Sequence, residues 1–251
     1  MNKTKIDWAD MTWNPVTGCL HGCEYCYARK IATRFGMPQL DNNCYVYTGK
    51  IKNYDDAVHT GPYPWGFAPT LHTYRLADPQ KIKKPQTIFV CSMADLFGDW
   101  VPDEWIQTVF KACEAAPQHR YLFLTKNPKG LCSLANRKML PTNDNFWYGT
   151  TVNTQRDLIY PGRLFDNTFI SIEPILENLY SGIGSFSRAS WIIVGAETGN
   201  RKDKVVPKKE WIDNIVETAK LTQASVFMKE SLRSLMGAGF KQEFPWGGVK
   251  A

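Results

Sequence analysis

Short runs of consecutive apolar residues recur from about residue 87 onward. They are rich in Val, Ile and Phe, and such runs predict strands that are buried on both faces. Helix-like stretches lie between them, in which apolar residues recur every three or four positions. The predicted strands are Thr87–Cys91, Tyr121–Thr125, Phe146–Val152, Thr168–Ile172, Trp191–Gly195 and Ser225–Met228, with Thr12–Val16 as an earlier one.

Three of the helix-like stretches carry a start signal. One opens at Pro102 and places Ile106, Val109, Phe110 and Cys113 on one face, and another opens at Pro207. The third opens at Asn127-Pro128, an N-cap followed by proline at the first helical position. Strands that alternate with helices indicate βαβ units and a parallel sheet. We therefore expect an α/β fold, a partial (open) (β/α)6-type TIM barrel, with a doubly wound sheet as the alternative.

Residues 35–84 interrupt this rhythm as an irregular insertion after the first strand. The stretch is rich in Gly, Pro, Tyr and Asn, and only Pro69–Leu76 looks helical. An insertion of this length is often a lid or a substrate loop, and simple decoration is the alternative. The sequence shows no internal repeat, so we expect a single domain over residues 1–251.

Composition and charge exclude only a few classes of protein. Of the 251 residues, 43% are hydrophobic, which is enough for a substantial core. No apolar run reaches the ~18 residues that a membrane helix needs, and the first residues lack the apolar core of a signal peptide. We therefore expect a cytoplasmic protein without a membrane partner. The net charge of +6 permits a polyanionic partner without requiring one.

Three of the seven cysteines are clustered with the spacing C-x3-C-x2-C, at Cys19, Cys23 and Cys26. Three neighbouring thiolates can hold a soft metal or an iron–sulfur cluster. A 4Fe-4S cluster held by three protein ligands keeps one iron free to bind something else, as catalytic zinc keeps an open position. Cys91 and Cys113 occupy core-like positions, and Cys44 and Cys132 have no assigned role.

Two other classes of protein could use the same cysteines. One is a zinc-binding, non-catalytic nucleic-acid-binding module in which His21 or Cys44 completes the site. His21 lies between two of the cysteines and would need a sharp loop to reach the same ion, and no second C-x2-C pair follows. The other is an iron–sulfur electron carrier, for which about 250 residues are more than electron transfer needs.

The cysteine spacing, with Tyr25 just before the last cysteine, resembles the signature of the radical S-adenosylmethionine (radical SAM) superfamily. The wider sequence is similar to a phage-type, uncharacterised family related to spore photoproduct lyase. That likeness covers most of the chain in order. The matching strings are Trp13-Asn14-Pro15-Val16-Thr17-Gly18-Cys19, Cys26-Tyr27-Ala28, Phe67-x-Pro69-x-x-His72-x-x-Arg75-Leu76, Phe89 to Phe97, Leu124 to Pro128, Ser171 to Pro174 and Val194 to Gly199.

The resemblance implies an enzyme of lyase or oxidoreductase type. In this superfamily a 4Fe-4S cluster binds S-adenosylmethionine and cleaves it reductively, which gives methionine and a 5′-deoxyadenosyl radical that abstracts a substrate hydrogen. The implied cofactors are thus the 4Fe-4S cluster, held by the three cysteines, and S-adenosyl-L-methionine. An external electron donor of flavodoxin or ferredoxin type is the implied partner.

The resemblance also implies cofactor-binding residues at the carboxyl ends of the strands. Ser92 and Asp95 follow the second strand, where relatives often carry a Gly-Gly-Glu-like turn from which this sequence departs. Thr151 and Asn153 follow the fourth strand, with an amide in place of the carboxylate found in many relatives. The alternatives are a helix cap for Asp95 and a polar strand end for Asn153. We expect Tyr25 to pack over the cluster or the adenine.

Glu173 is the strongest non-cysteine candidate. Ser171 and Glu173 alternate with isoleucines and so point to one face, and a carboxylate directed into a barrel is costly unless it is paired or bound to a ligand. We predict cofactor-binding and catalytic roles for Glu173, and a catalytic role for Asp95. An internal salt bridge with Lys126 or Arg75 is the alternative for Glu173. Farther along, Gly195 and Glu197 are predicted to approach the adenine.

The relationship to spore photoproduct lyase suggests a nucleic-acid or nucleotide substrate. Basic residues and the aromatic side chains of the insertion could contact phosphates and stack on bases, although solvated helix faces explain the charges equally well. The basic residues are Lys81, Lys83, Lys84, Lys126, Lys129, Arg137, Lys138, Arg201, Lys202, Lys204, Lys208 and Lys209, and the aromatic ones are Tyr45, Tyr47, Tyr54, Tyr63 and Trp65.

Overall fold

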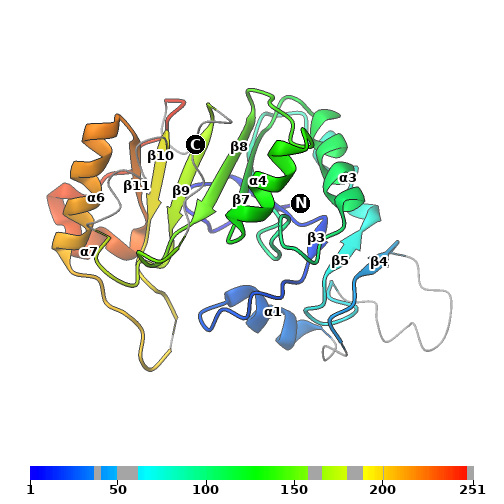
Figure 1. Ribbon diagram of the computed structural model, residues 1–251, viewed down its shortest axis with the longest axis horizontal. Coiled ribbons are helices and arrows are strands. Elements are labelled where there is room, and N and C mark those ends of the chain that lie inside the picture. Colours follow the sequence, from blue (N-terminus) through cyan, green and yellow to red (C-terminus); the bar gives the residue numbers. More distant parts are fainter. Residues whose placement is uncertain (37–40, 50–61, 158–165, 180–188, 200, 248–251) are drawn as a thin grey trace. The chain divides into compact units, whose positions relative to one another are not determined.

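The computed structural model describes residues 1–36, 41–49, 62–157, 166–179, 189–199 and 201–247 (Figure 1). The chain divides into two compact units. The first comprises Met1–Thr4 and Asp10–Pro141, and the second comprises Lys5–Ala9 and Thr142–Ala251. The N-terminal segment therefore contributes to both units. Residues 37–40 and 50–61 of the predicted insertion, which include Tyr54, lie outside the described residues.

The first unit contains two sets of strands. In one set β1 pairs antiparallel with β2, and β2, β6 and β7 are parallel, in the order β1-β2-β6-β7. A small sheet has the order β3-β5-β4. The strands are β1 (Asn2–Lys3), β2 (Met11–Trp13), β3 (Val16–Thr17), β4 (Tyr45–Tyr47), β5 (Thr70–His72), β6 (Thr87–Val90) and β7 (Arg120–Thr125).

The described part of the first unit also contains a 3₁₀ helix, Thr73–Arg75, and four α-helices: α1 (Tyr27–Phe35), α2 (Asp78–Lys81), α3 (Asp103–Glu114) and α4 (Pro128–Asn136). The predicted apolar face of α3 is buried, and its Phe110 packs edge-on against Phe123 of β7, with ring centroids 5.3 Å apart. The predicted N-cap of α4 is present, because the side chain of Asn127 accepts a 3.2 Å hydrogen bond from the backbone N–H of Gly130.

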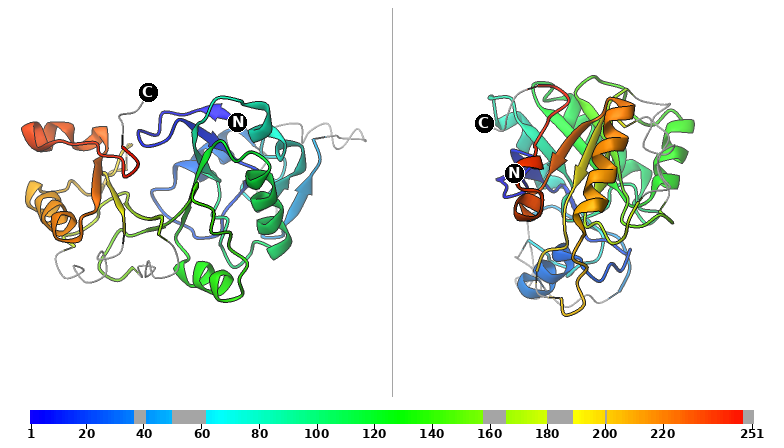
Figure 2. Two further views of the ribbon diagram at one scale, coloured as in Figure 1. Left: turned by 90° about the horizontal axis from the view of Figure 1, so that it is seen from above. Right: turned by 90° about the vertical axis from the view of Figure 1, so that its left-hand side faces the viewer.

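The second unit contains four parallel strands in the order β8-β9-β10-β11. They are β8 (Phe146–Thr151), β9 (Thr168–Ile172), β10 (Trp191–Val194) and β11 (Ser225–Met228), accompanied by α6 (Lys209–Thr222) and α7 (Arg233–Met236). Every residue of β8, β9 and β10 is buried, as the apolar runs predict. Helix α6 runs alongside β10 and β11 in all three views (Figures 1 and 2).

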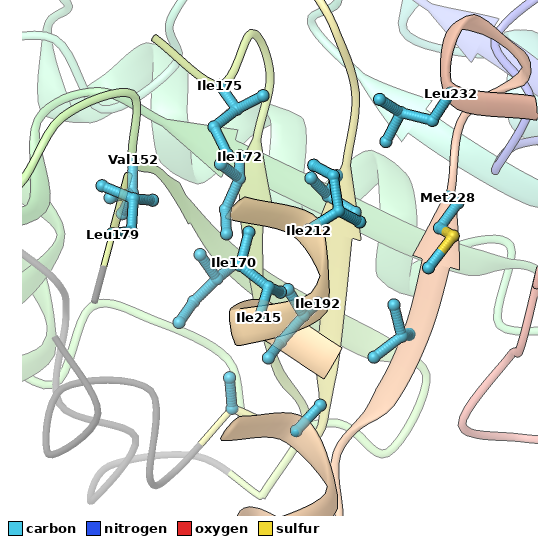
Figure 3. Close-up of a cluster of buried hydrophobic side chains, with 14 of the residues drawn as sticks. Val152, Ile170, Ile172, Ile175, Leu179, Ile192, Ile212, Ile215, Met228 and Leu232 are labelled. Carbon is cyan, nitrogen blue, oxygen red and sulfur yellow. The ribbon is translucent and has the colours of Figure 1, made fainter. Parts of the chain in front are cut away.

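The core of the second unit lies between α6 and its strands. Ile170, Ile172 and Ile192 from the strands meet Ile212 and Ile215 from the helix (Figure 3). All of these side chains are at most 2% exposed. Burying one such aliphatic side chain contributes about 1.5–3 kcal/mol, so this cluster is a main source of the unit's stability.

Two sequence predictions about local structure were wrong. The predicted strand Thr12–Val16 is two strands, because Asn14 and Pro15 separate β2 from β3 and proline cannot donate a ladder hydrogen bond. The predicted helix Pro69–Leu76 is strand β5 followed by a 3₁₀ helix, Thr73–Arg75. Leu71 pairs with Val16 on one side and Val46 on the other, so tertiary pairing overrides the local pattern.

The predicted α/β class with mostly parallel strands is confirmed. Closure of the strands into a partial barrel and the single domain over residues 1–251 stay predictions. No helix in the described ranges is both long and apolar enough to cross a lipid bilayer.

Candidate functional site

The segment 18–26 that carries the three cysteines, here called the cysteine loop, is anchored at its first residue. Gly18, which follows β3, has φ +89° and forms a parallel bridge with Ala94. Its N–H donates to the carbonyl of Met93 at 2.9 Å. A Cβ at position 18 would lie 2.2 Å from the carbonyl oxygen of Ala68, so both the conformation and the space require glycine. The loop therefore starts from a fixed point.

The three cysteines are free thiols and partly buried. Cys26 is the N-cap of α1, and its Sγ accepts a 3.3 Å hydrogen bond from the backbone N–H of Arg29. Cys19 and Cys26 pack against one small apolar cluster, which consists of Ala28, Ala32, Phe67 and Met93. Two of the three sulfur atoms thus lie in a partly apolar setting.

The surroundings of Cys19 favour the protonated thiol in the absence of a cation. Burial raises the pKa of Cys19 to about 12, with further increases from the charges of Asp95, Cys23 and Cys26 and an opposing effect from a backbone hydrogen bond of His21. A bound cation would favour the thiolate instead, because a metal ligand must be the thiolate.

Arg29 secures the loop from the helix side. Its guanidinium donates to the carbonyl of Cys19 at 2.9 Å and lies 5.0 Å above the ring of Phe67. The residue that donates a backbone hydrogen bond to Cys26 thereby also fixes Cys19. Sequence reasoning missed Arg29, because the fold of the loop and not the local sequence brings its guanidinium to Cys19, ten residues away.

Asp95 is buried and holds the middle of the loop. Its Oδ2 lies 2.7 Å from Nε2 of His21 and accepts from the backbone N–H of Lys126 at 2.8 Å. Its Oδ1 accepts from the hydroxyl of Thr125 at 2.7 Å and from the N–H of Phe97 at 3.1 Å. These four contacts occupy both carboxylate oxygens and show how Asp95 connects the cysteine loop to β7.

The two residues that could complete a zinc site are engaged elsewhere. Nε2 of His21 faces Asp95, and the ring lies edge-on to Trp100 with centroids 4.8 Å apart. The thiol of Cys44 donates to the carbonyl of Trp100 at 3.0 Å. Neither contact points to a fourth ligand for an ion bound at the three cysteines.

Tyr25 is part of the cysteine loop, and Ser92 lies beside the start of α1. The hydroxyl of Tyr25 accepts from Nζ of Lys126 at 3.0 Å. Ser92 follows β6; its hydroxyl donates to Oδ1 of Asn14 at 3.2 Å, and its carbonyl accepts from the hydroxyl of Tyr27 at 2.8 Å. The first unit therefore brings Ser92 and Asp95 to the loop that contains Tyr25.

The remaining predicted residues belong to the second unit, where three neighbouring strands end in one row. Ile172, Val194 and Met228 are in register, so Glu173, Gly195 and Lys229 follow them side by side. Nζ of Lys229 lies 2.8 Å from Oε2 of Glu173, and a Cβ on Gly195 would lie 2.8 Å from Cδ of Lys229. Glycine thus makes room for the lysine to reach across the central strand.

Glu173 has further partners on its other oxygen. The indole N–H of Trp8 donates to Oε1 at 2.8 Å, and the hydroxyl of Ser171 donates to the same oxygen at 3.4 Å. Burial alone would lower the pKa of Lys229, but the charge and hydrogen bond of Glu173 raise it. Glu173 thus forms an internal salt bridge, but its partner is Lys229, which sequence reasoning missed, and not Lys126 or Arg75.

Thr151, Asn153 and Glu197 are buried polar residues of the same unit. Thr151 ends β8 in register with Ser171, and Nδ2 of Asn153 donates to the carbonyl of Pro174 at 2.6 Å. Asn153 is therefore linked to the residue that follows Glu173.

Glu197 forms a two-point contact with Arg201, at 2.6 and 2.8 Å. This hydrogen bonding lowers the pKa of Glu197, and the carboxylate also accepts from the N–H of Val205 at 3.3 Å. Its described contacts hold the segment that follows β10.

Solved structures of spore photoproduct lyase are similar to this chain. The complex with dinucleoside spore photoproduct has a TM-score of 0.55 and 12% identity, over 91% of this chain and 79% of that one. A variant with the same ligand gives 0.57 and 14%, over 91% and 79%. A variant with bound AdoMet and the dinucleoside gives 0.54 and 12%, over 90% and 78%. These likenesses show a shared fold.

A comparison with curated proteins found no match. A family model, described as "Protein of unknown function (DUF5131)", matches residues 3–233, which is most of the chain. The chain therefore belongs to this family.

Proposed function

We propose that this protein is a radical SAM enzyme that holds a 4Fe-4S cluster at Cys19, Cys23 and Cys26 and cleaves S-adenosylmethionine. The observation that carries the proposal is the cysteine loop: three free, partly buried thiols between an anchored glycine and a helix N-terminus. The similarity of the fold to an enzyme whose structure contains AdoMet supports it.

The donor set fits a cluster better than a single ion. Among the described residues, no three His, Cys, Asp or Glu side chains are grouped so that they could hold one metal ion. A 4Fe-4S cluster needs no such grouping, because each thiolate binds a different iron. Backbone hydrogen bonds to sulfur, such as those to Cys19 and Cys26, also tune the potential of such clusters.

The chain's own residues would fix the loop and orient the cofactor. Arg29 holds Cys19, and Asp95 holds the loop through His21. Lys126 orients the ring of Tyr25, which we propose covers the cofactor, and Ser92 offers polar groups beside α1. The bound cluster would supply the electron that splits S-adenosylmethionine into methionine and a 5′-deoxyadenosyl radical. Four protein contacts favour a positioning role for Asp95 over a direct catalytic one.

The polar strand ends of the second unit are our proposed contacts for S-adenosylmethionine. Glu173 is the first of these, since its carboxylate is held in one orientation by Lys229 and Trp8. Asn153 is coupled to it through Pro174. Thr151 and Gly195 are proposed neighbours of the same cofactor. For Glu197 the pairing with Arg201 favours support of the following segment.

We propose a nucleotide or nucleic-acid substrate, because structures of the similar lyase contain a dinucleoside. A reduced flavodoxin or ferredoxin is the proposed electron source. Binding to nucleic acid should weaken steeply with salt if phosphate contacts dominate, whereas stacking on aromatic residues should not.

Anaerobic iron and sulfide analysis, together with an assay for 5′-deoxyadenosine, tests the proposal. Wild-type protein should take up about four irons and form 5′-deoxyadenosine with dithionite. The three single alanine variants of Cys19, Cys23 and Cys26 should lose both properties. Cys44→Ala and Cys132→Ala are matched controls that should keep them. Zinc at unit stoichiometry, or full iron loading of the triple variant, would disprove the proposal.

Substitutions in the second unit test the cofactor contacts separately. Glu173→Ala or Asn153→Ala should weaken S-adenosylmethionine binding while iron content stays unchanged. Unchanged affinity in both, measured by calorimetry on anaerobic protein, would show that these residues do not bind the cofactor.

A further inference from the structure

Helix α1 carries a row of large apolar side chains that face solvent. Tyr27, Ile31 and Phe35 are spaced four residues apart, and they are 51%, 37% and 59% exposed. The buried positions of the helix are Ala28 and Ala32, which pack into the small cluster with Cys19 and Cys26. Residues four apart share one helix face, so the three form a continuous apolar strip. Such strips on a protein surface mark interaction sites.

Positive charge flanks this strip. Lys30 and Arg34 are exposed and lie beside it, and α1 contains no acidic residue. Neither Lys30 nor Arg34 takes part in any ion pair among the described residues. An apolar centre with a charged rim is the usual anatomy of a transient protein interface. The charge here is complementary to an acidic partner, which it would steer toward the helix.

The strip begins beside the cysteine loop. Cys26 is the N-cap of α1, and Tyr27 is the first helical residue. A nine-residue helix is about 13 Å long, so the whole strip lies within about that distance of the proposed iron ligand. A partner that covers the strip would bring its own redox group near the cysteine loop.

We propose that this face, formed by Tyr27, Ile31 and Phe35 with Lys30 and Arg34, is the docking face for an acidic electron-transfer protein of flavodoxin type. The inference rests on the proposed function. In the complex one electron passes from the reduced flavin of the donor, which is oxidised by one electron, to the cluster at the three cysteines, which is reduced by one. Redox encounters of this kind use small interfaces, so a strip on a single helix is sufficient.

A nucleic acid is a poorer occupant of this face. Its binding relies on cations that neutralise successive phosphates, and two of the five side chains are cationic. Ile31 at the centre of the strip offers no ring for base stacking. The apolar centre therefore favours a protein partner.

The test compares two reductants on cluster-loaded protein. Ile31→Asp combined with Phe35→Ser, and separately Lys30→Glu combined with Arg34→Glu, should each slow reduction by a reduced flavodoxin at least about tenfold, followed as bleaching of the cluster absorbance. Reduction by dithionite, which needs no docking face, should remain at the wild-type rate. Calorimetry should show flavodoxin binding at least about tenfold weaker, and the wild-type affinity should fall with salt.

Helix α6 provides the matched control. Leu221 is 76% exposed and follows the exposed Lys220, so Leu221→Asp with Lys220→Glu replaces an apolar and a cationic side chain on the surface of a helix of the second unit, where it also removes the ion pair of Lys220 with Glu217. This variant should bind and accept electrons from flavodoxin as the wild type does.

Equal rates with flavodoxin in wild-type protein and both α1 variants would overturn the docking proposal. Loss of nucleic-acid binding in the α1 variants, with flavodoxin reduction intact, would overturn it as well and assign the face to nucleic acid. If wild-type protein takes up no iron, the proposed function is wrong, and calorimetry on the unloaded protein still decides whether α1 binds flavodoxin.

Discussion

The cysteine loop and the row Glu173-Gly195-Lys229 differ in the partners of their polar atoms. In the loop, sulfur atoms accept hydrogen bonds from backbone N–H groups, while charged side chains such as Asp95 hold the loop in place. In the row, the charged groups themselves are paired, Glu173 with Lys229 and Trp8. In the loop no counterion is paired with the sulfur atoms among the described contacts, whereas in the row the charges of Glu173 and Lys229 neutralise each other. A metal site needs the former arrangement, and a fixed hydrogen-bonding surface needs the latter.

The largest expected effect is at the anchor of the cysteine loop. Gly18→Ala adds a Cβ that meets the backbone of Ala68, and it also forces a residue with a side chain to φ +89°. The backbone of Ala68 cannot move aside as a flexible side chain could. We therefore expect the free energy of unfolding to fall by roughly 3 kcal/mol or more, and iron loading to be lost. Urea denaturation and iron analysis measure these two losses.

Gly22 is the matched control for this substitution. It has φ +72°, but an added Cβ would have nothing within 4 Å. Gly22→Ala should therefore cost only the roughly 1–2 kcal/mol of the left-handed conformation. Similar losses at both positions would show that crowding at Ala68 does not hold the loop.

A second effect should appear in the row of the second unit. Lys229→Met leaves the carboxylate of Glu173 without its counterion. Breaking a buried pair costs about 3–5 kcal/mol, and since the side chains of Lys229 and Glu173 are 26% and 18% exposed we expect roughly 2 kcal/mol. Adding Glu173→Gln should recover most of this loss in denaturation experiments. If the double variant is as unstable as Lys229→Met, charge pairing does not explain the contact.

Acid should destabilise the region next to the cysteine loop. Burial, with a smaller contribution from the charge of Arg75, lowers the pKa of His72 from 6.5 to about 3, and Nε2 of His72 lies 2.8 Å from the hydroxyl of Thr17. The unfolded chain therefore binds one more proton between pH 6.5 and 3, and stability falls as the pH drops through this window. The slope is at most about 1.4 kcal/mol per pH unit.

The variant His72→Gln tests whether His72 causes this loss of stability at low pH. Its free energy of unfolding should depend less on pH between 6.5 and 3 than that of the wild type. An unchanged slope in urea denaturation at several pH values would assign the acid sensitivity to other groups.

The smallest effect separates a positioning role for Asp95 from a cofactor-binding one. Asp95→Asn keeps the shape but removes the charge that faces His21, and its NH2 group must face the backbone N–H of either Lys126 or Phe97, so iron should be released to a chelator about tenfold faster, with unchanged affinity for S-adenosylmethionine. Asp99→Asn changes a neighbouring carboxylate that accepts from Asn127, and it should release iron at the wild-type rate. Weaker S-adenosylmethionine binding with normal iron release would show instead that Asp95 binds the cofactor.

Much of the fold could be predicted because the strands are buried on both faces. The apolar runs at β6 to β11 agree with the structure to within a residue or two, since short runs rich in Val, Ile and Phe are typical of strands that are covered on both faces. The Pro69–Leu76 segment failed because pairing of Leu71 with two other strands decides its conformation. Local pattern carries no information on such partners.

The candidate site was predictable only where its chemistry is local in sequence. The three cysteines lie within eight residues, so their spacing alone identifies them. Lys229 was missed because its contact with Glu173 depends on the register of β9, β10 and β11. Asp95 and His21 are 74 residues apart, and only the fold joins them.

The contact between Trp8 and Glu173 has a consequence for biosynthesis. The two residues are 165 positions apart, and residues 5–9 belong to the unit that the chain's second half forms. A ribosome that adds about 5–20 residues per second exposes Trp8 for many seconds before Glu173 emerges. In the folded protein the indole is 2% exposed and also packs near Phe169 and Trp191. During synthesis it lacks these partners and is exposed to solvent. Nascent chains of this protein should therefore bind chaperones through residues 5–9 until the second half is complete.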